Sequence, residues 1–432
     1  MKRYPKYKPF GNYWISEIPS HWNEQKIKHL FDERVEKGHP DEPLLAATQN
    51  QGVILKSDYE SRTVEATKDL HLLKFVKEGD FVISLRSFQG GIEYSYCQGI
   101  ISPAYTIMIP RPEIDSSYFR HLAKSRTFIE LLKGCVTGIR EGQNINYALL
   151  RTYLLPLPPL DEQKAIADYL DKKMEQIDRF ISLQKEAISL LKELRQAEIT
   201  KAVTKGLDEN AEMKDSGVEW IGEIPSEWNV IKLSHIFRTI GSGTTPISGD
   251  SESYDNGNIA WINSGDLNDK HLLNTCHKVT ESAIKKYSAL KIYPKGTLFV
   301  AMYGANIGKI CISDIEACCN QACCGLTNLI STSTLSYIFY QLLACREYWM
   351  LNAQGGGQKN INMDIVRSTR LLLPPLNIQE NIADYLDQKC AEIDSAIQNK
   401  EALIEKVTEY KIRLISDAVT GKIDVREEDI KP

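Results

Sequence analysis

The chain of 432 residues contains the same scaffold twice. Residues 11–22, GNYWISEIPSHW, return as residues 217–228, GVEWIGEIPSEW, with eight of twelve positions identical. Residues 155–171, LPLPPLDEQKAIADYLD, return as residues 371–387, LLLPPLNIQENIADYLD, with twelve of seventeen positions identical. Because the two matches keep their order along the chain, the sequence predicts two similar halves whose intervening residues differ in content.

Composition places this duplicated chain among ordinary globular proteins. Hydrophobic residues make up 42% and charged residues 25%, which excludes a disordered or collagen-like protein. No apolar run approaches the roughly 18 residues that a membrane span needs. The basic N-terminus lacks the apolar stretch of a signal peptide, so we expect a cytoplasmic protein whose ten cysteines stay reduced.

Each half has the same order of parts: a mixed globular region, a Pro-Pro break and a long helix. Residues 80–85 and 297–301 are predicted strands, and residues 118–132 and 335–351 are predicted helices. We therefore expect an α+β fold with two tandem α/β domains and two long helices that form an antiparallel coiled coil. The expected boundaries are 1–157 and 207–373 for the two domains, 158–206 for the first helical segment, and 374–432 for the second helical segment with its C-terminal tail.

Heptad spacing predicts the two long helices. Their seams, with alternating steps of four and three residues, are Leu170, Met174, Ile177, Ile181, Gln184, Ile188 and Leu191 in the first helix, and Leu386, Cys390, Ile393, Ile397, Lys400, Ile404 and Val407 in the second. Such spacing favours a coiled coil, and each helix is the simplest partner for the other. Asp161 and Asn377, just after the Pro-Pro pairs, are the expected N-caps.

Gln184 and Lys400 occupy the same place in the two seams, where an apolar residue is expected. Two interpretations stay open. Either each is a polar core residue that fixes the register of the coiled coil, or both lie just off the seam in water.

No motif in the sequence indicates an active site. The segment 304–309 resembles a phosphate-binding loop, but only three residues separate its glycines. The best metal candidate by composition is a group of four thiols, Cys318, Cys319, Cys323 and Cys324. They crowd one short strand-like segment instead of forming well-separated pairs, so we expect them to pack in the core. We expect no catalytic residue, metal site or cofactor in this chain.

The repeated motifs resemble those of a known family. The duplicated Gly-x-x-Trp-Ile-x-Glu-Ile-Pro-x-x-Trp opening, the Leu-Pro-Pro-Leu-x-x-Gln-x-x-Ile-Ala-x-Tyr-Leu-Asp entry to each helix, the YGANIGK segment at 303–309 and the WINSGDL segment at 261–267 carry the resemblance. Together they are similar to the DNA-specificity subunit of type I restriction-modification systems, over the whole chain and in the family's order.

This resemblance implies a non-catalytic subunit with two target-recognition domains, each reading one half of an interrupted, asymmetric site in double-stranded DNA. The helices would set the distance between the half-sites and dock two modification (methyltransferase) subunits. Those subunits would carry S-adenosylmethionine and methylate adenine, while restriction subunits would carry the ATP- and Mg-dependent translocase and nuclease. Tyr169 and Tyr385, outside the mutual seam, are the expected partner-binding residues.

Base reading in DNA uses polar side chains on loops, above all Arg, Asn and Gln, which can make paired hydrogen bonds in the major groove. In the first domain the candidates are Thr48, Gln49, Asn50, Gln51, Arg86, Ser87, Gln89, Arg140, Gln143 and Asn144. In the second domain they are Ser242, Thr244, Thr245, Asn263, Ser264, Tyr303, Asn306, Gln358, Lys359 and Asn360.

Three other functions remain open: a separate specificity subunit of a type II-like restriction-modification enzyme, a stand-alone tandem DNA-binding regulator, and a nuclease with an unrecognised site. The net charge of -5 argues against strong binding to DNA phosphates by this chain alone. Residues 1–160 carry a net charge of +3, and residues 377–432 carry -5. We therefore expect partner subunits to supply much of the basic surface.

Overall fold

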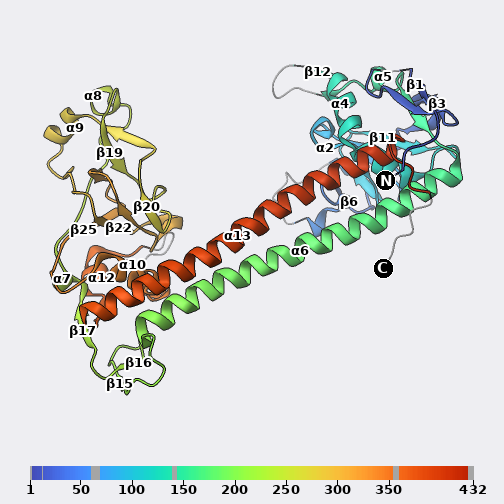
Figure 1. Ribbon diagram of the computed structural model, residues 1–432. Coiled ribbons are helices and arrows are strands. Elements are labelled where there is room, and N and C mark those ends of the chain that lie inside the picture. Colours follow the sequence, from blue (N-terminus) through green and yellow to red (C-terminus); the bar gives the residue numbers. More distant parts are fainter. Residues whose placement is uncertain (1, 12, 60–68, 139–143, 354–359, 427–432) are drawn as a thin grey trace. The chain divides into compact units, whose positions relative to one another are not determined.

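The computed structural model describes all residues except 1, 12, 60–68, 139–143, 354–359 and 427–432 (Figure 1). The chain divides into two compact units: unit 1 is Met1–Lys185 with Glu401–Pro432, and unit 2 is Glu186–Lys400. Each unit combines a mixed body of helices and strands with part of both long helices, which confirms the α+β prediction. The domain boundaries expected from the sequence stay a prediction. None of the described helices is both long and apolar enough to cross a membrane.

A four-stranded antiparallel sheet forms the centre of unit 1. Its order is β4 (Phe31–Arg34), β11 (Thr106–Pro110), β8 (Phe81–Ile83) and β9 (Glu93–Tyr94). The predicted strand at 80–85 is β8, and its Phe81 packs edge-on against Phe31 and Phe119 in the core. Edge-on aromatic packing of this kind adds to the stabilisation that burial of the rings provides.

Smaller pairs and short helices complete unit 1. The antiparallel pairs are β1 (Tyr7–Pro9) with β2 (Glu17–Pro19), β3 (Asn23–Lys26) with β14 (Leu154–Leu157), β5 (Leu45–Thr48) with β6 (Gly52–Leu55), β7 (Lys74–Val76) with β10 (Gly99–Ile101), and β12 (Val136–Thr137) with β13 (Asn144–Ile145). The helices are α1 (Ile27–Leu30), α2 (Ser87–Gly90), α3 (Ser116–Lys124), α4 (Arg126–Gly134) and α5 (Tyr147–Leu150), with 3-10 turns at Lys56–Asp58 and Leu70–Leu72.

The described part of unit 2 contains two sheets of more than two strands. The larger has the order β18 (Phe237–Ser242), β25 (Cys323–Leu329), β22 (Thr297–Ala301), β23 (Ile310–Ser313) and β20 (Lys270–Leu272), with only the β20–β23 pair parallel. The smaller has the order β21 (His277–Val279), β19 (Ile259–Ile262) and β24 (Ala317–Cys319). The predicted strand at 297–301 is β22, with the bounds that the sequence indicated.

The remaining elements of unit 2 repeat features of unit 1. Two antiparallel pairs, β15 (Met213–Asp215) with β16 (Glu223–Pro225) and β17 (Asn229–Lys232) with β26 (Arg370–Leu373), have counterparts in β1–β2 and β3–β14. The helices are α7 (Leu233–Ile236), α8 (Ser251–Tyr254), α9 (Glu281–Lys286), α10 (Leu335–Ala344), α11 (Arg346–Leu351) and α12 (Met363–Ser368), with a 3-10 turn at Gly304–Asn306.

Both helices predicted within the domains are broken in two. Ser125 separates α3 from α4 with extended backbone, and its hydroxyl caps α4 by accepting a hydrogen bond of 3.2 Å from the Phe128 amide. Cys345 separates α10 from α11 in unit 2. The apolar periodicity runs through both breaks, which is why the sequence indicated single helices.

The two long helices are α6 (Leu160–Lys205) and α13 (Leu376–Val419). Each begins one residue before its expected N-cap, since the Gln163 amide donates to the Pro159 carbonyl and the Gln379 amide to the Pro375 carbonyl. Asp161 and Asn377 therefore lie in the first turn, and the N-cap prediction is wrong. A carboxylate at Asp161 still favours the positive end of the helix.

The heptad seam is confirmed by burial. Every seam residue predicted in the two helices is buried or partly buried, while most of their neighbours are exposed. In unit 1, Asp178 of α6 pairs with Lys411 of α13 at 2.5 Å. In unit 2, Arg195 pairs with Asp394 at 3.1 Å, and Glu198 accepts a hydrogen bond of 3.1 Å from Tyr385. Rising numbers in α6 meet falling numbers in α13, so the helices are antiparallel.

Gln184 and Lys400 are each partly buried, as the other seam residues are. This burial favours the interpretation that places them within the seam over the one that places both in water.

In each unit, the glutamine of the duplicated motif hydrogen-bonds the start of a long helix to the body of that unit. Gln163 accepts from the Asp115 amide at 2.7 Å and donates to the carbonyl oxygens of Pro158 and Glu113. Gln379 accepts from the Thr334 amide at 3.0 Å and donates to the carbonyls of Pro374 and Thr332 in the same way. Both side chains are fully buried. The Gln of the duplicated motif is therefore a structural residue.

Candidate nucleic-acid interface

Two polar loops of unit 1 meet around one cavity of about 650 Å³. The first is the β5–β6 turn, and the second runs from the end of β8 into α2. The cavity is lined by Ala47, Thr48, Gln49, Asn50, Gln51, Tyr59, Ser84, Leu85, Arg86, Gln89, Glu93 and Tyr105. Six of the ten residues that the sequence nominated in this domain thus come together, although they lie on loops some 35 positions apart.

The β5–β6 turn is closed by its own side chains. The Thr48 hydroxyl donates to the Gly52 carbonyl at 2.9 Å and accepts from the Gln51 amide at 3.1 Å. Gly52 has φ +78°, and a Cβ there would lie 2.6 Å from the Tyr94 carbonyl oxygen. Only glycine fits this position, so the turn holds Gln49, Asn50 and Gln51 against the sheet.

Two nominated residues are part of the loops' internal structure. Ser87 is 1% exposed, and its hydroxyl accepts from the Ser84 amide at 2.9 Å. Thr48 is 6% exposed and makes the turn bonds described above. Both hydroxyls are used within the chain, which argues against base contact by Thr48 and Ser87, and that contact stays a prediction. The nominated side chains that line the cavity and are exposed are Gln49, Asn50, Gln51, Arg86 and Gln89.

An ion pair lies beneath both loops. The Lys124 ammonium, at the end of α3, lies 2.6 Å from both carboxylate oxygens of Glu93. It also donates to the carbonyl oxygens of Gln49 and Gly90, each at 3.0 Å. Glu93 is 2% exposed, and burial raises its pKa to about 7, although the Lys124 charge acts in the opposite direction.

The last candidates of unit 1 lie elsewhere. Asn144 begins β13, is exposed, and accepts a hydrogen bond from the Ile145 amide with its own side chain. It does not line the cavity formed by the other two loops. Arg140 and Gln143 lie outside the described residues.

In unit 2 the candidates gather around the turn between β24 and β25. The side-chain amide of Asn320 donates to the side-chain oxygen of Asn263 at 2.9 Å, and the Thr245 hydroxyl donates to the side-chain oxygen of Gln321 at 2.6 Å. Ser242, at the end of β18, pairs with Cys324 across the sheet. The β24–β25 turn therefore connects the loops after β18 and β19 into one polar surface.

Close backbone approach fixes the loop after β18. A Cβ at Gly243 would lie 1.6 Å from the Cys319 carbonyl oxygen, so a side chain cannot be accommodated there. The next carbonyl, that of Thr244, accepts from the Trp261 indole at 3.2 Å. Thr245 is thereby positioned beside Gln321.

A second group of candidates lies past the end of β22. Tyr303 is 39% exposed and forms an isolated β-bridge with Asn360. Asn306 ends the 3-10 turn that follows Tyr303, and Ser264 is partly buried in the loop after β19. Gln358 and Lys359 lie outside the described residues.

Sequence reasoning missed Asn320 and Gln321. The signal was an Asn-Gln pair between two short runs rich in small apolar residues, which is typical of a turn between strands. Cys318, Cys319, Cys323 and Cys324 are all fully buried, and burial raises the pKa of Cys318 and Cys324 to about 12, which confirms that they pack in the core. Among the described residues, no group of three or more His, Cys, Asp or Glu is arranged to hold a metal ion.

The two tyrosines expected to bind partners differ in exposure. Tyr169 is 3% exposed within the core of unit 1, so the expectation that its ring lies on an open helix face is wrong. The body of unit 1 packs on the first turns of α6 beside the seam and covers it. Tyr385, its counterpart in the repeat, is 37% exposed, and its hydroxyl donates to Glu198.

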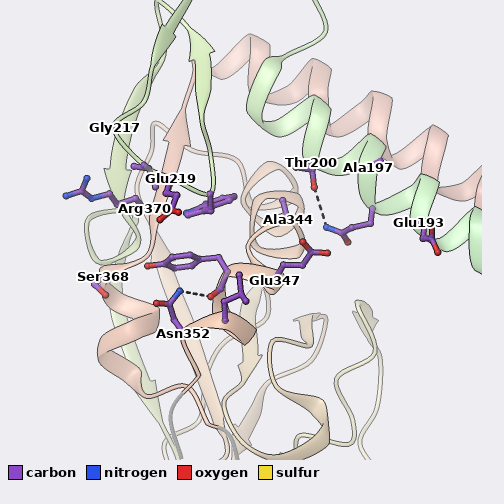
Figure 2. A pocket seen from close by; sticks show the side chains of 15 residues that line it. Glu193, Ala197, Thr200, Gly217, Glu219, Ala344, Glu347, Asn352, Ser368 and Arg370 are labelled. Carbon is purple, nitrogen blue, oxygen red and sulfur yellow. Dashed lines mark hydrogen bonds between the residues drawn. The ribbon is translucent and has the colours of Figure 1, made fainter.

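A groove of about 1030 Å³ lies beside α6 in unit 2 (Figure 2). Figure 2 shows Glu193, Ala197 and Thr200 on α6, across the groove from Glu347 on α11. The rings of Trp220 and Tyr348 form its aromatic part, with centroids 6.0 Å apart.

Comparison with known proteins agrees with this architecture. Residues 225–407 match the family model described as "Type I restriction modification DNA specificity domain". The putative type I restriction enzyme MjaX specificity subunit of Methanocaldococcus jannaschii is 24% identical over 95% of this chain and 96% of that protein. The MjaVIII specificity subunit of the same organism is 26% identical over 86% of this chain and 88% of that protein.

Solved structures share the fold. The crystal structure of the HsdS subunit from Thermoanaerobacter tengcongensis aligns with a TM-score of 0.56 at 16% identity, over 96% of this chain and all of that one. A chain from a structure described as "Structural basis underlying complex assembly and conformational transition of the type I R-M system" aligns with a TM-score of 0.72 at 16% identity, over 94% of this chain and 99% of that one. The duplicated motifs, the paired long helices and these matches together show that residues 225–407 carry the type I restriction modification DNA specificity domain and that the chain is similar, over nearly its whole length, to specificity subunits of type I restriction enzymes.

Proposed function

We propose that each unit of this chain reads one half of an asymmetric, interrupted DNA site, and that α6 and α13 set the spacing between the halves. The observation that carries this proposal is the duplication itself. Each unit presents a surface of amide, hydroxyl or guanidinium side chains, and these are the groups that read base edges in the major groove. The two surfaces differ in residues and in supporting structure, so the two half-sites differ in sequence.

In unit 1 the proposed base-contacting residues are those at the surface of the cavity, Gln49, Asn50, Gln51, Arg86 and Gln89. Amide side chains suit adenine, and the Arg86 guanidinium suits guanine. In unit 2 the proposed set surrounds the β24–β25 turn and comprises Thr245, Asn263, Asn320, Gln321, Tyr303 and Asn306. Arg140, Gln143, Gln358 and Lys359 keep their place in the proposal on sequence grounds alone.

The chain works with partner subunits in this proposal. Two modification subunits bind it and supply S-adenosylmethionine and the methyl-transfer chemistry, and restriction subunits supply ATP- and Mg-dependent translocation and cleavage. This chain supplies recognition. Its nearly balanced charge supports that division, because strong non-specific binding to DNA needs many phosphate contacts from Lys and Arg.

The groove in Figure 2 supports docking of a partner helix on α6. Leu190 and Leu194 of α6 are 57% and 45% exposed, and Leu351 near the groove is 86% exposed. Exposed apolar side chains at helical spacing are typical of a protein interface. The groove is lined by three carboxylates, Glu193, Glu219 and Glu347, and by one cationic side chain, Arg370. This excess of negative charge favours a partner segment with basic residues.

The test is co-expression of the chain with modification subunits of a type I system, followed by selection from a library of randomised double-stranded DNA. The expected result is one bipartite sequence with a fixed gap. Replacing Gln49 and Arg86 by Ala should relax one half-site, and replacing Thr245 and Asn263 by Ala should relax the other. Selection of a single continuous sequence, or loss of both half-sites in either variant, would contradict the proposal.

A further inference from the structure

The recognition loops of unit 1 share one internal support, and the support is a single ammonium group. Lys124 donates to the backbone carbonyl of Gln49 in the β5–β6 turn and to that of Gly90 at the end of α2, each at 3.0 Å. These two segments carry the residues that line the cavity. A shift of Lys124 would therefore displace both loops together.

Glu93 holds the ammonium in this place. Both of its carboxylate oxygens lie 2.6 Å from the Lys124 nitrogen, and its side chain is 2% exposed, whereas that of Lys124 is 27% exposed. Charge-assisted hydrogen bonds of this length are stronger than neutral ones. The carboxylate lies on β9 at the edge of the central sheet, so it couples the loops to that sheet.

In the described part of unit 2, no such pair lies at the matching position, although Arg346, just past the helix break, pairs with Asp269 and donates to the Gly308 carbonyl at 3.0 Å. The residue directly before the helix break is Lys124 in unit 1 and Ala344 in unit 2. The loops after β18 and β19 in unit 2 are joined to the β24–β25 turn by neutral hydrogen bonds of Asn320 and Gln321. The ion pair therefore serves one half of the molecule.

We propose that Lys124 and Glu93 are positioning residues for the half-site that unit 1 reads: Lys124 sets the relative placement of the two recognition loops, and Glu93 fixes Lys124. This inference rests on the proposed function. It names the groups that control how accurately unit 1 recognises its half-site. Neither residue needs to touch DNA. Their effect reaches the bases through Gln49, Arg86 and Gln89.

The carboxyl group of Glu93 makes this positioning depend on pH. Its pKa is raised to about 7, so it loses much of its negative charge between pH 8 and pH 6. The other charged or titratable side chains lining the cavity are Arg86, Tyr59 and Tyr105, and Lys124 contacts the carboxylate from α3. The hold on Lys124 therefore weakens as the pH falls.

The test uses the complex of the chain with its modification subunits and a library of randomised double-stranded DNA. For wild type, we expect the selectivity for the unit 1 half-site to fall at least several-fold from pH 8 to pH 6, while the other half-site is unaffected. Glu93→Gln should stay at the low-pH value throughout. Lys124→Met should lose tenfold or more in selectivity at that half-site, and Lys124→Arg, which can donate to the same oxygens, should recover part of it.

Two further variants separate positioning from folding. Lys124→Met leaves a buried carboxylate without its partner and is expected to lower the melting temperature, whereas the double variant Glu93→Gln with Lys124→Met removes both charges and should restore it. Selectivity should stay low in the double variant. Asp80→Asn is the matched control, because it breaks the buried pair with Arg34 at 2.8 Å without touching either loop.

The outcomes distinguish this inference from the function on which it rests. A wild-type complex that enriches no bipartite sequence overturns the proposed function and this inference with it. If the wild type selects two half-sites and Lys124→Met selects both equally well, the inference alone is overturned. The same holds if the double variant regains its selectivity together with its stability. The same relaxation in Asp80→Asn would also overturn it.

Discussion

The Tyr118 hydroxyl donates a hydrogen bond of 2.8 Å to the backbone carbonyl oxygen of Val419, although the two residues lie 301 positions apart. Both are fully buried in the core of unit 1, together with Leu414 and Ala418. Tyr337 repeats the contact in unit 2, with its hydroxyl 3.5 Å from the carbonyl of Val203 near the end of α6. The C-terminal end of each long helix is thus part of the unit that it enters.

Truncation after Lys400 should therefore unfold unit 1 and spare unit 2. The deletion removes four buried apolar side chains from the unit 1 core, Leu414, Ala418, Val419 and Val425. Limited proteolysis with mass spectrometry should recover a resistant fragment that corresponds to most of Glu186–Lys400. A chain ending at Arg426 is the control and should resist proteolysis as the full chain does. Equal resistance of both units in the long truncation would show that unit 1 does not depend on α13.

Gln163→Leu and Gln379→Leu should each destabilise their own unit by about 3 kcal/mol, because each removes three hydrogen bonds to the backbone, one of them buried and two partly buried. Chemical denaturation followed by separate probes in the two units would measure the loss. Gln388→Leu on the exposed face of α13 is the matched control and should change stability by less than about 0.5 kcal/mol. A small loss of stability for Gln163→Leu and a large loss for Gln379→Leu would mean that the two glutamines do not contribute equally to the stability of their units.

The long helices and their seam were predictable from the sequence because a heptad pattern depends only on local spacing. The breaks at Ser125 and Cys345 were not, since apolar periodicity continues through both and the packing of the body decides where the helix bends. The burial of Tyr169 also depends on packing: the same position in the repeat, Tyr385, is 37% exposed.

The candidate site, like the fold, could be predicted only where local sequence is enough. Residue chemistry on loops indicated Gln49, Asn50, Gln51 and Arg86, and the fold brings these residues to one cavity, while their contact with DNA stays a prediction. Residue chemistry cannot show whether a hydroxyl is used internally, which is why Ser87 was nominated. The sequence could not predict the support from Lys124 and Glu93 either. The two residues lie 31 positions apart, and Lys124 holds the loops through main-chain carbonyls, which carry no sequence signal.

Glu93→Gln should flatten the pH dependence of the stability of unit 1. The folded state raises the pKa of Glu93 from 4.5 to about 7, so it favours the protonated carboxyl. This contribution to stability is fully present below pH 4.5 and is lost as the pH rises through about 7. The difference between wild type and Glu93→Gln in free energy of unfolding should change by about 3 kcal/mol over that range. Denaturation at several pH values measures it.

This trend runs opposite to the one expected for DNA selectivity, which should improve as the pH rises. The opposite signs separate a positioning role from a purely structural one, because selectivity that merely followed stability would be best at low pH. Asp80→Asn is again the control, and it should leave the pH dependence between 5 and 8 unchanged. A wild-type stability that rises with pH across this range, relative to Glu93→Gln, would contradict the assigned shift.

Asn320→Ala should relax recognition of the half-site read by unit 2 by roughly tenfold or more, equivalent to about 1–3 kcal/mol for one base contact. The variant removes the bond to Asn263 and with it a connection between the β24–β25 turn and the loop after β19. Selection from randomised DNA measures the change, and the half-site read by unit 1 serves as the internal control. Unaltered selection at both half-sites would remove Asn320 from the proposed interface.

The spacing proposal predicts the effect of shortening both long helices by one heptad. A suitable pair of deletions is residues 183–189 in α6 and 400–406 in α13, which keeps the antiparallel register seen at Asp178 with Lys411 and at Arg195 with Asp394. Seven residues shorten a helix by about 10.5 Å and turn it by only about 20° from a whole number of turns. The gap between half-sites should then shrink by about three base pairs at roughly 3.4 Å each.

The half-site sequences should stay the same in this variant, because no residue of either recognition surface is removed. Methylation mapping in cells that carry the complete system would report the gap and both half-sites together. A single deletion in α6 alone is the useful comparison: it puts the two seams out of register, so it should lower the stability of the complex more than the matched pair does. New half-site sequences at the old gap would refute the helices as the spacer, because spacing would then be set within the recognition surfaces themselves.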